Sequence, residues 1–169
     1  AGRISPDKGF ASLGYNVKIG YYDQENQDLH PNNTVIDELW NAYPTMTETT
    51  VRNALALFLF RGDDISKKVS VLSGGEKARL TLARLMLSKM NLLILDEPTN
   101  HLDINSREVL ENALSGFDGT IIAVSHDRYF INKLATRILD FGAESEHHLF
   151  AFEGGYGEYL DYRRRYLTS

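Results

Sequence analysis

The sequence predicts an α/β fold with a mostly parallel sheet and a small helical subdomain. Two short apolar runs, residues 92–95 and 120–124, have the pattern of strands that are buried on both faces, as in parallel sheets. Polar residues follow both runs, at the end of the strand where open α/β sheets place their ligands. Apolar residues with helical spacing occur between positions 34 and 60 and predict the helical subdomain.

Length and composition are those of an ordinary globular domain. The chain has 169 residues, a formal net charge of −5 and no cysteine. The negative charge argues against broad nucleic-acid binding, and the lack of cysteine excludes disulfides and thiolate metal sites. No run approaches the roughly 18 apolar residues that are needed to span a bilayer. We therefore expect a cytoplasmic protein without a membrane segment, in which the arginines at 163–165 form a solvated helix face.

The first predicted elements are a turn and a strand. Proline, aspartate and glycine at positions 6–9 have the chemistry of a turn. Alternating apolar and polar residues at 17–21 predict a strand, which ends close to Gln24. A polar residue at the end of a strand is usually just exposed, so the residue type alone assigns no role to Gln24.

Two helices are predicted next. Thr34 is expected to cap a helix over 35–42, which must end before Pro44 because proline disfavours helix in the preceding residue. A second helix is predicted over 48–60, where an apolar stripe indicates packing against a core.

Ser73 and Glu76 have the Ser-x-x-Glu spacing of a capping box, which predicts a helix over 76–89. A capped helix explains these two residues without any ligand. Two consecutive glycines, Gly74 and Gly75, remove side chains from the start of this helix. Its N–H groups and the positive end of its dipole can then face an anion directly.

The first apolar run leads to two adjacent carboxylates, Asp96 and Glu97. Neighbouring side chains point to opposite sides of an extended strand, so we expect the two carboxylates to take different roles. The alternative is a solvent-exposed acidic pair at the end of a strand. Asp103 is expected to cap a further helix over 104–115.

The second apolar run carries His126 just beyond its end. If the two runs are parallel strands, His126 can reach the same edge of the sheet as the carboxylates. The adjacent pair His147 and His148 is expected in a polar loop and is not a metal site. The remaining predicted elements are a helix over 127–134, a strand over 137–141, a turn over 144–148, an edge strand over 149–153 and an arginine-rich terminal helix.

Three motifs occur in a fixed order along the chain. They are Leu72-Ser73-Gly74-Gly75-Glu76-Lys77, Asp96-Glu97-Pro98-Thr99-Asn100-His101-Leu102-Asp103 and Val124-Ser125-His126-Asp127. They resemble the signature loop, the Walker B strand with the D-loop, and the switch histidine of an ATP-binding cassette (ABC) ATPase. Residues 97–103 and 125–130 narrow the resemblance to subfamily F, whose members are soluble twin-cassette ATPases that act on the translating ribosome. The resemblance implies the P-loop NTPase core of an ABC cassette.

The resemblance also implies ATP and Mg²⁺ as cofactors and a role for each motif. Glu97 would orient or deprotonate the attacking water, and His126 would contact the γ-phosphate. Asp96 would hold Mg²⁺ through water, and Gln24 would be the Q-loop glutamine and a second Mg²⁺ ligand. The signature loop would bind the γ-phosphate of an ATP held mainly by the opposite cassette. The other implied cofactor-binding residues are Ser73, Gly74, Gly75, Glu76 and Asp103.

One part of the family pattern is missing, because the sequence contains no Gly-x-x-x-x-Gly-Lys-Ser/Thr phosphate-binding loop. We expect the amino-terminal part of the cassette, including the phosphate-loop strand, to be absent and the chain to be a carboxy-terminal cassette fragment. Its expected parts are residues 1–24, the end of the amino-terminal core up to the Q-loop; 25–90, the helical subdomain and signature helix; 91–145, the catalytic core; and 146–169, the terminal strand and helix.

The missing loop changes the expected activity and partners. It would supply the N–H groups and the lysine that hold the phosphates, so we expect the fragment to be inactive alone. The expected partners are an upstream cassette of the same polypeptide, the ribosome, and a second copy that associates through the incomplete sheet.

Two other functions stay open. The chain could belong to the nucleotide-binding subunit of a membrane transporter, although residues 100–103 and 127–130 resemble the soluble subfamily. It could also be an interaction module without turnover. Within subfamily F, a role in antibiotic resistance is as open as one in translation.

Overall fold

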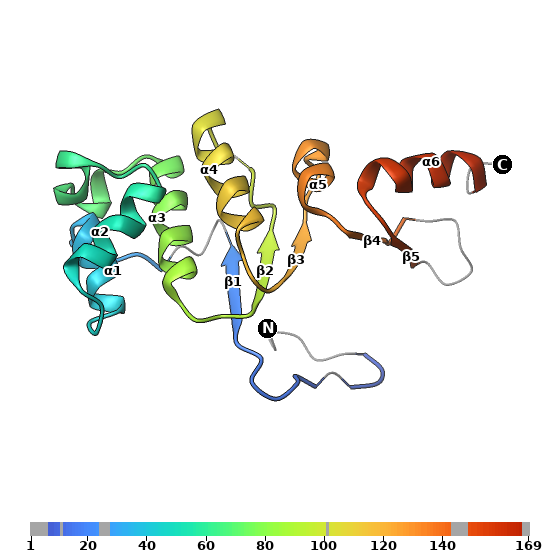
Figure 1. The fold of residues 1–169 in the computed structure, drawn as a ribbon, viewed down its shortest axis with the longest axis horizontal. Helices are drawn as coiled ribbons and strands as arrows, with labels where there is room; N and C mark the ends of the chain where they lie inside the picture. The colour runs from blue at the N-terminus through green and yellow to red at the C-terminus, as the bar shows by residue number, and fades with distance from the viewer. Residues whose placement is uncertain (1–6, 11, 24–27, 101, 143–148, 167–169) are drawn as a thin grey trace. The chain divides into compact units, whose positions relative to one another are not determined.

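The computed structural model describes residues 7–10, 12–23, 28–100, 102–142 and 149–166. The chain forms two compact units, one that ends at Val124 and one that begins at Ser125. Each unit is described by itself (Figure 1). In the described part of the chain, no helix combines the length and the apolar character that crossing a membrane requires.

A parallel sheet of three strands forms the centre of the first unit. The strands are β1 (Ile19–Asp23), β2 (Leu92–Asp96) and β3 (Thr120–Val124), in the order β1-β2-β3. All three run in the same direction, so that their carboxyl ends meet at one edge (Figure 1). Leu93 and Leu95 on β2 are buried, which makes β2 the core strand. The predicted parallel sheet is confirmed.

Helical segments lie between β1 and β2 in the sequence. They are α1 (Val35–Ala42), α2 (Glu48–Leu57), the short 3-10 turns η1 (Gly62–Ser66) and η2 (Val69–Val71), and α3 (Gly74–Leu87). The predicted cap of α1 is confirmed, since Thr34 Oγ1 accepts a hydrogen bond from the N–H of Asp37 (3.2 Å). Leu39 on α1 and Leu55 on α2 are buried in the core of this helical part.

Helix α2 is shorter than its apolar pattern predicts. It ends at Leu57 and not at Phe60. Leu59 adopts a positive φ of 63°, which a continuing right-handed helix does not allow. Phe58 and Phe60 are buried nonetheless. The apolar stripe therefore marks core residues correctly, although its last residues lie outside the helix.

Helix α4 (Ile104–Ser115) follows β2 and lies beside α3 (Figure 1). Its inward residues, Leu110 and Leu114, are buried. It ends at Gly116, as the sequence predicts.

Strand β3 is far more exposed than a strand buried on both faces. Ile122 is 50% exposed and Val124 is 59% exposed, whereas Leu93 on β2 is fully buried. Strand β3 pairs with β2 along one edge, and no described strand of this unit pairs with its other edge. The side chains of β3 therefore have strand neighbours on one side only. The apolar run predicts the strand correctly, but its expected burial on both faces is wrong.

The second unit contains two helices and a two-stranded antiparallel sheet. Its elements are α5 (Arg128–Leu134), β4 (Arg137–Asp140), β5 (Phe150–Glu153) and α6 (Tyr156–Tyr166). The predicted helices and strands are confirmed, and the predicted turn over 144–148 lies outside the described residues.

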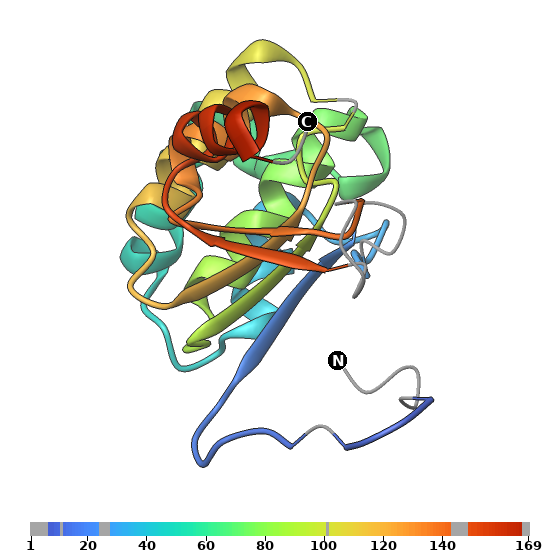
Figure 2. The same cartoon turned by 90° about the vertical axis from the view of Figure 1, so that its right-hand side faces the viewer.

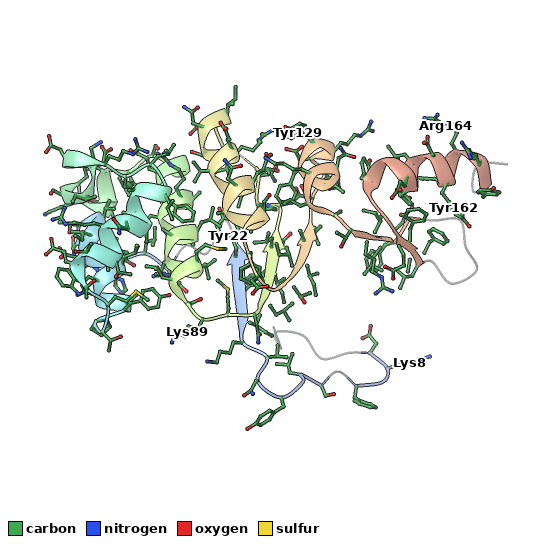
Figure 3. The ribbon with its side chains drawn as sticks, viewed as in Figure 1. Lys8, Tyr22, Lys89, Tyr129, Tyr162 and Arg164 are labelled. Atoms are coloured by element: carbon green, nitrogen blue, oxygen red, sulfur yellow. The ribbon has the colours of Figure 1, made fainter. Side chains whose placement is uncertain are left out.

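Aromatic rings hold α6 against β5 within the second unit. The rings of Phe150 and Tyr162 stack with their centroids 5.4 Å apart, and those of Phe152 and Tyr159 meet edge to face at 5.9 Å. Figure 3 shows Tyr162 on the strand side of α6 and Arg164 on the opposite side. The Tyr159 hydroxyl also donates a short hydrogen bond to Asp140 on β4.

Candidate functional site

The carboxyl end of β2 carries the two predicted carboxylates. Asp96 is the last residue of β2, where it pairs with Asp23 of β1 and Val124 of β3. Its side chain is exposed, so its oxygen atoms are available to water or a cation. Oxygen atoms of this kind are the ligands that Mg²⁺ prefers.

Glu97 is placed by a tight turn and not by the strand. Its backbone has a positive φ of 42°, which is uncommon for a residue with a side chain. Its N–H donates to the carbonyl oxygen of Val124 (2.9 Å), and its own carbonyl accepts from the N–H of Asn100 (3.2 Å). Carboxylate oxygen Oε1 of Glu97 is buried. The expected alternation along an extended chain therefore does not describe the pair, because the turn orients Glu97 separately from Asp96.

The signature loop begins with the predicted capping box. Ser73 Oγ accepts from the N–H of Glu76 (3.3 Å), and Glu76 Oε2 accepts from the N–H of Ser73 (2.8 Å). The hydrogen bond from the Ser73 backbone is the main reason why the pKa of Glu76 lies below its usual value. The carboxylate of Glu76 is thereby kept ionised at the start of α3, where a negative charge is favourable.

The two glycines of the signature loop have different surroundings. No neighbouring atom lies within 4 Å of a Cβ placed on Gly74, so the helix start is open there. A Cβ on Gly75 would lie 2.8 Å from Asp103 Oδ2 and 3.1 Å from Ser106 Oγ. Gly74 therefore leaves open surface at the helix start, whereas Gly75 allows α3 and α4 to approach closely.

Asp103 caps α4 with both oxygen atoms. Oδ1 accepts from the N–H of Ser106 (2.8 Å), and Oδ2 accepts from the Ser106 hydroxyl (2.9 Å). These two bonds, with the backbone bond as the larger effect, hold the pKa of Asp103 below its usual value. The cap of α4 and the signature loop thus lie in contact, although 28 positions separate Gly75 from Asp103 in the sequence.

Arg79 is a neighbour of this site that sequence reasoning missed. Its guanidinium lies over the Phe60 ring, 5.3 Å from the ring centroid. After the hydrogen bonds described above, the charge of Arg79 further lowers the pKa of Glu76 and Asp103. The sequence could have indicated this, because Arg79 follows Glu76 by three residues and residues with this spacing lie on the same face of a helix.

Two predicted site residues lie outside the described part of the first unit. Gln24 lies outside the described residues. His126 is an exposed residue of the second unit, two positions beyond the end of β3. Within the described parts of the chain, no three His, Cys, Asp or Glu side chains come close enough together to hold a metal ion.

The arrangement offers an oxygen ligand at Asp96, a fixed carboxylate at Glu97 and an open helix start at Gly74. A family described as "ABC transporter" matches residues 9–100, more than half of the chain. This chain belongs to that ABC family. The match includes the signature loop and both carboxylates.

Curated ABC relatives match almost the whole chain. Identity is 54% to Bacillus subtilis YdiF over 97% of the chain, and 44% to Escherichia coli O157:H7 YbiT over 94%. Identity is 41% to the energy-dependent translational throttle protein EttA of Escherichia coli K12, over 100% of the chain. The matched residues make up 25%, 30% and 31% of these relatives, so the chain spans between a quarter and a third of their length. The resemblance to ABC ATPases of subfamily F is confirmed.

A solved ABC structure has the same fold. It is the dimeric structure of the ATP-binding cassette MJ0796 in a post-hydrolysis state, bound to ADP and Pi. The likeness has a TM-score of 0.60 at 23% identity and covers 73% of this chain and 58% of that chain. The expected cassette fold is thereby confirmed.

The residues present fit part of an Mg²⁺–ATP site. The exposed carboxylate of Asp96 suits a hydrated Mg²⁺, and the open start of α3 at Gly74 suits a phosphate oxygen. The sequence itself contains no Gly-x-x-x-x-Gly-Lys-Ser/Thr pattern.

Proposed function

We propose that the chain is part of a subfamily F ABC ATPase that binds and hydrolyses Mg²⁺–ATP and acts on the ribosome in translation. The observation that carries this proposal is the contact between the signature loop and the cap of α4, where Gly75 meets Asp103. Both belong to motifs of the ABC pattern. The 41% identity to EttA, whose name describes a throttle of translation, supports the ribosome as the partner.

The site residues take the following roles in this proposal. Asp96 would hold Mg²⁺ through water, and Mg²⁺ held there would supply charge neutralisation for the phosphates. Glu97 orients the attacking water or takes its proton, and its turn with Val124 fixes the carboxylate for that step. Gln24 would be a further Mg²⁺ ligand, and His126 would contact the γ-phosphate.

The signature loop serves the opposite cassette in this proposal. Ser73 and Gly74 present the start of α3 to the γ-phosphate of an ATP that the partner holds. The partner is an upstream cassette of the same polypeptide, and the cassette of known structure is itself dimeric. The four-part division of the chain at residues 24, 90 and 145 belongs to the same proposal.

The 169-residue chain alone is proposed to be inactive. The support for this proposal is that the sequence has no Gly-x-x-x-x-Gly-Lys-Ser/Thr loop, whose backbone and lysine supply much of the positioning in phosphoryl transfer. Phosphate release from Mg²⁺–ATP tests this, and the expected rate is that of buffer. Turnover that survives purification and disappears in Glu97→Gln would show that other residues replace the loop.

The ribosomal role is tested in the full-length gene product. Glu97→Gln should retain ATP binding and slow hydrolysis by about 10²–10⁴-fold, the usual cost of losing one acid–base group. The ATP-bound protein should then persist on ribosomes and pellet with them. Glu108→Gln, on the exposed face of α4, is the matched control and should behave as wild type.

Three outcomes separate the alternatives. Enhanced pelleting of Glu97→Gln with ATP supports the ribosomal partner in the cytoplasm, and growth with ribosome-targeting antibiotics then separates resistance from general translation. Slowed hydrolysis without enhanced pelleting would support the ATPase activity and contradict the ribosome as the partner. Hydrolysis that is unaffected by Glu97→Gln would contradict the catalytic role of Glu97. The alternative that then stands is an interaction module without turnover.

A further inference from the structure

Glu38 on α1 is a buried carboxylate to which none of the steps above assigns a role. Its side chain is only 1% exposed. Burying a charged group is costly unless the group is paired and hydrogen-bonded. The two oxygens of Glu38 accept hydrogen bonds from two different segments, and this arrangement fixes those segments relative to each other.

The first set of donors comes from the segment between β1 and α1. The backbone N–H of His30 donates to Glu38 Oε2 (3.2 Å), and Asn33 Nδ2 donates to the same oxygen (2.8 Å). The ring nitrogen Nδ1 of His30 lies 3.1 Å from Oε2. This segment begins at Asp28, directly after the residues that follow Gln24 in the sequence.

The second set of contacts comes from α3, the helix that begins at the signature loop. Arg84 Nη1 donates to Glu38 Oε1 (2.9 Å) and to the carbonyl oxygen of Asp28 (2.7 Å). The hydroxyl of Tyr43, at the end of α1, donates to the carbonyl oxygen of Arg84 (2.6 Å). Helix α3 is therefore bound to α1 at two points and to the preceding segment at a third.

The same segment also holds the residues before the signature loop. The N–H of Val69 donates to the carbonyl oxygen of Asn33 (2.9 Å), and the N–H of Ser70 donates to that of Pro31 (3.0 Å). Both donors belong to η2, which lies directly before the loop. Residues 28–38 thus fix the chain on both sides of the signature loop.

We propose that Glu38 is a positioning residue that couples the segment following Gln24 to the signature loop, so that the two shift together during the ATPase cycle. This inference rests on the proposed function. Glu38 touches neither the signature loop nor the carboxylates of β2, and it acts through Arg84 and Asn33.

The charge of Glu38 is needed because its donors approach both oxygens. In Glu38→Gln, one oxygen becomes an NH₂ group that must face an N–H donor of Arg84, His30 or Asn33. A buried donor is then left without an acceptor, while the shape of the side chain is unchanged.

Amide hydrogen exchange of the full-length gene product tests the coupling directly. Glu38→Gln should speed exchange at Val69 and Ser70 and across residues 28–34 by about 10-fold or more, because losing hydrogen bonds to the charged carboxylate loosens the segment whose carbonyl groups hold the amides of Val69 and Ser70. Amides of β2 and β3 should exchange as in wild type. Unchanged exchange in η2 would overturn the proposal.

Two further variants make this test specific. Glu48→Gln removes a carboxylate from the exposed ion pair with Arg52 on α2 and should leave exchange in η2 unchanged. Asn33→Ala removes only one of the donors to Glu38 and should speed exchange of the same amides by a smaller factor. This variant replaces Glu38→Gln in the test if Glu38→Gln does not fold. An equal effect of Glu48→Gln would contradict the role of Glu38.

ATPase kinetics then separate positioning from mere stability. If Glu38 acts through the signature loop, the loss of kcat/KM in Glu38→Gln combined with Ser73→Ala is smaller than the product of the two single losses. Losses that multiply would mean that Glu38 only stabilises the fold. If the wild-type protein hydrolyses no ATP, the proposed function fails, and the exchange result still decides whether the segments are coupled.

Discussion

The backbone N–H of Glu97 donates to the carbonyl oxygen of Val124, and this bond ties the turn after β2 to the end of β3. It holds Glu97 with a φ of 42°, a conformation that costs of order 1–3 kcal/mol for a residue with a side chain. The proposed catalytic carboxylate is thus fixed by a neighbouring strand at the expense of local stability.

Replacing Glu97 should separate stability from activity. Asparagine tolerates a positive φ better than glutamate, so we expect Glu97→Asn to raise the free energy of unfolding by about 0.5–1 kcal/mol. The same change should abolish ATP hydrolysis by the full-length gene product. Urea denaturation measures the first effect. Glu108→Asn, on α4, is the control and should lower stability slightly because asparagine is a poorer helix former than glutamate. Equal losses of stability in the two variants would contradict the backbone strain at Glu97.

The two signature-loop glycines should respond differently to alanine. Gly75→Ala places a methyl group against Asp103 and Ser106, and we expect a loss of about 1–3 kcal/mol because the crowded cap must shift. Gly74→Ala meets no atom and should stabilise α3 by up to about 1 kcal/mol. Thermal and urea unfolding of both variants give the comparison, and similar changes in the two would show that the α3–α4 contact is loose.

Acid should weaken the cap of α4. The pKa of Asp103 is lowered in the folded state from the usual 3.8, first by the backbone bond from Ser106. A lowered carboxyl pKa adds stability that is complete above pH 3.8 and is lost as pH falls through the lower folded value. Asp103→Asn should therefore flatten the fall in unfolding free energy below about pH 4. Urea unfolding of the wild type and the variant at several acidic pH values gives the comparison, and equal slopes would contradict the role of this cap.

Alkali should weaken the second unit through Tyr159. Burial, followed by the hydrogen bond to Asp140, raises the pKa of Tyr159 from 10.0 to about 12. A raised pKa adds stability that is present below pH 10.0 and is lost as pH rises towards 12. Tyr159→Phe should lower stability at neutral pH and reduce the loss between pH 10 and 12. Tyr129→Phe, at an exposed tyrosine, is the matched control, and the idea fails if both variants behave alike.

The open side of β3 should promote self-association. Ile122 and Val124 are apolar and half exposed on a strand whose outer edge pairs with no described strand of its unit. Such edges favour pairing with another chain. Light scattering during size exclusion should give a mass above 19.1 kDa for the chain at micromolar concentration. Ile122→Lys should lower that mass, whereas Ile104→Lys, at an exposed position on α4, should not. A wild-type monomer would contradict this prediction.

Local features of the site were predictable from the sequence, and contacts across the fold were not. The capping box at Ser73 depends on residues three positions apart, so its spacing alone predicts it. The turn conformation of Glu97 depends on Val124, and the closeness of Gly75 depends on Asp103. Each involves a partner more than 25 positions away. The exposure of β3 was missed for the same reason, because an apolar run predicts a strand but not what covers it.

The order of the parallel sheet affects how the chain is assembled during synthesis. Strand β1 must wait for β2, because Ile19 pairs with Leu92 and the whole helical part lies between them. Contacts within the helical part join residues that are nearer in the sequence, such as Glu38 and Arg84, 46 positions apart, so this part can form first. Figure 2 shows β1 alongside β2, and Figure 3 labels Tyr22 on β1. Until β2 emerges, β1 and its buried Tyr22 have no sheet partner. This interval is when the nascent chain is most exposed to misassembly and most in need of chaperone protection.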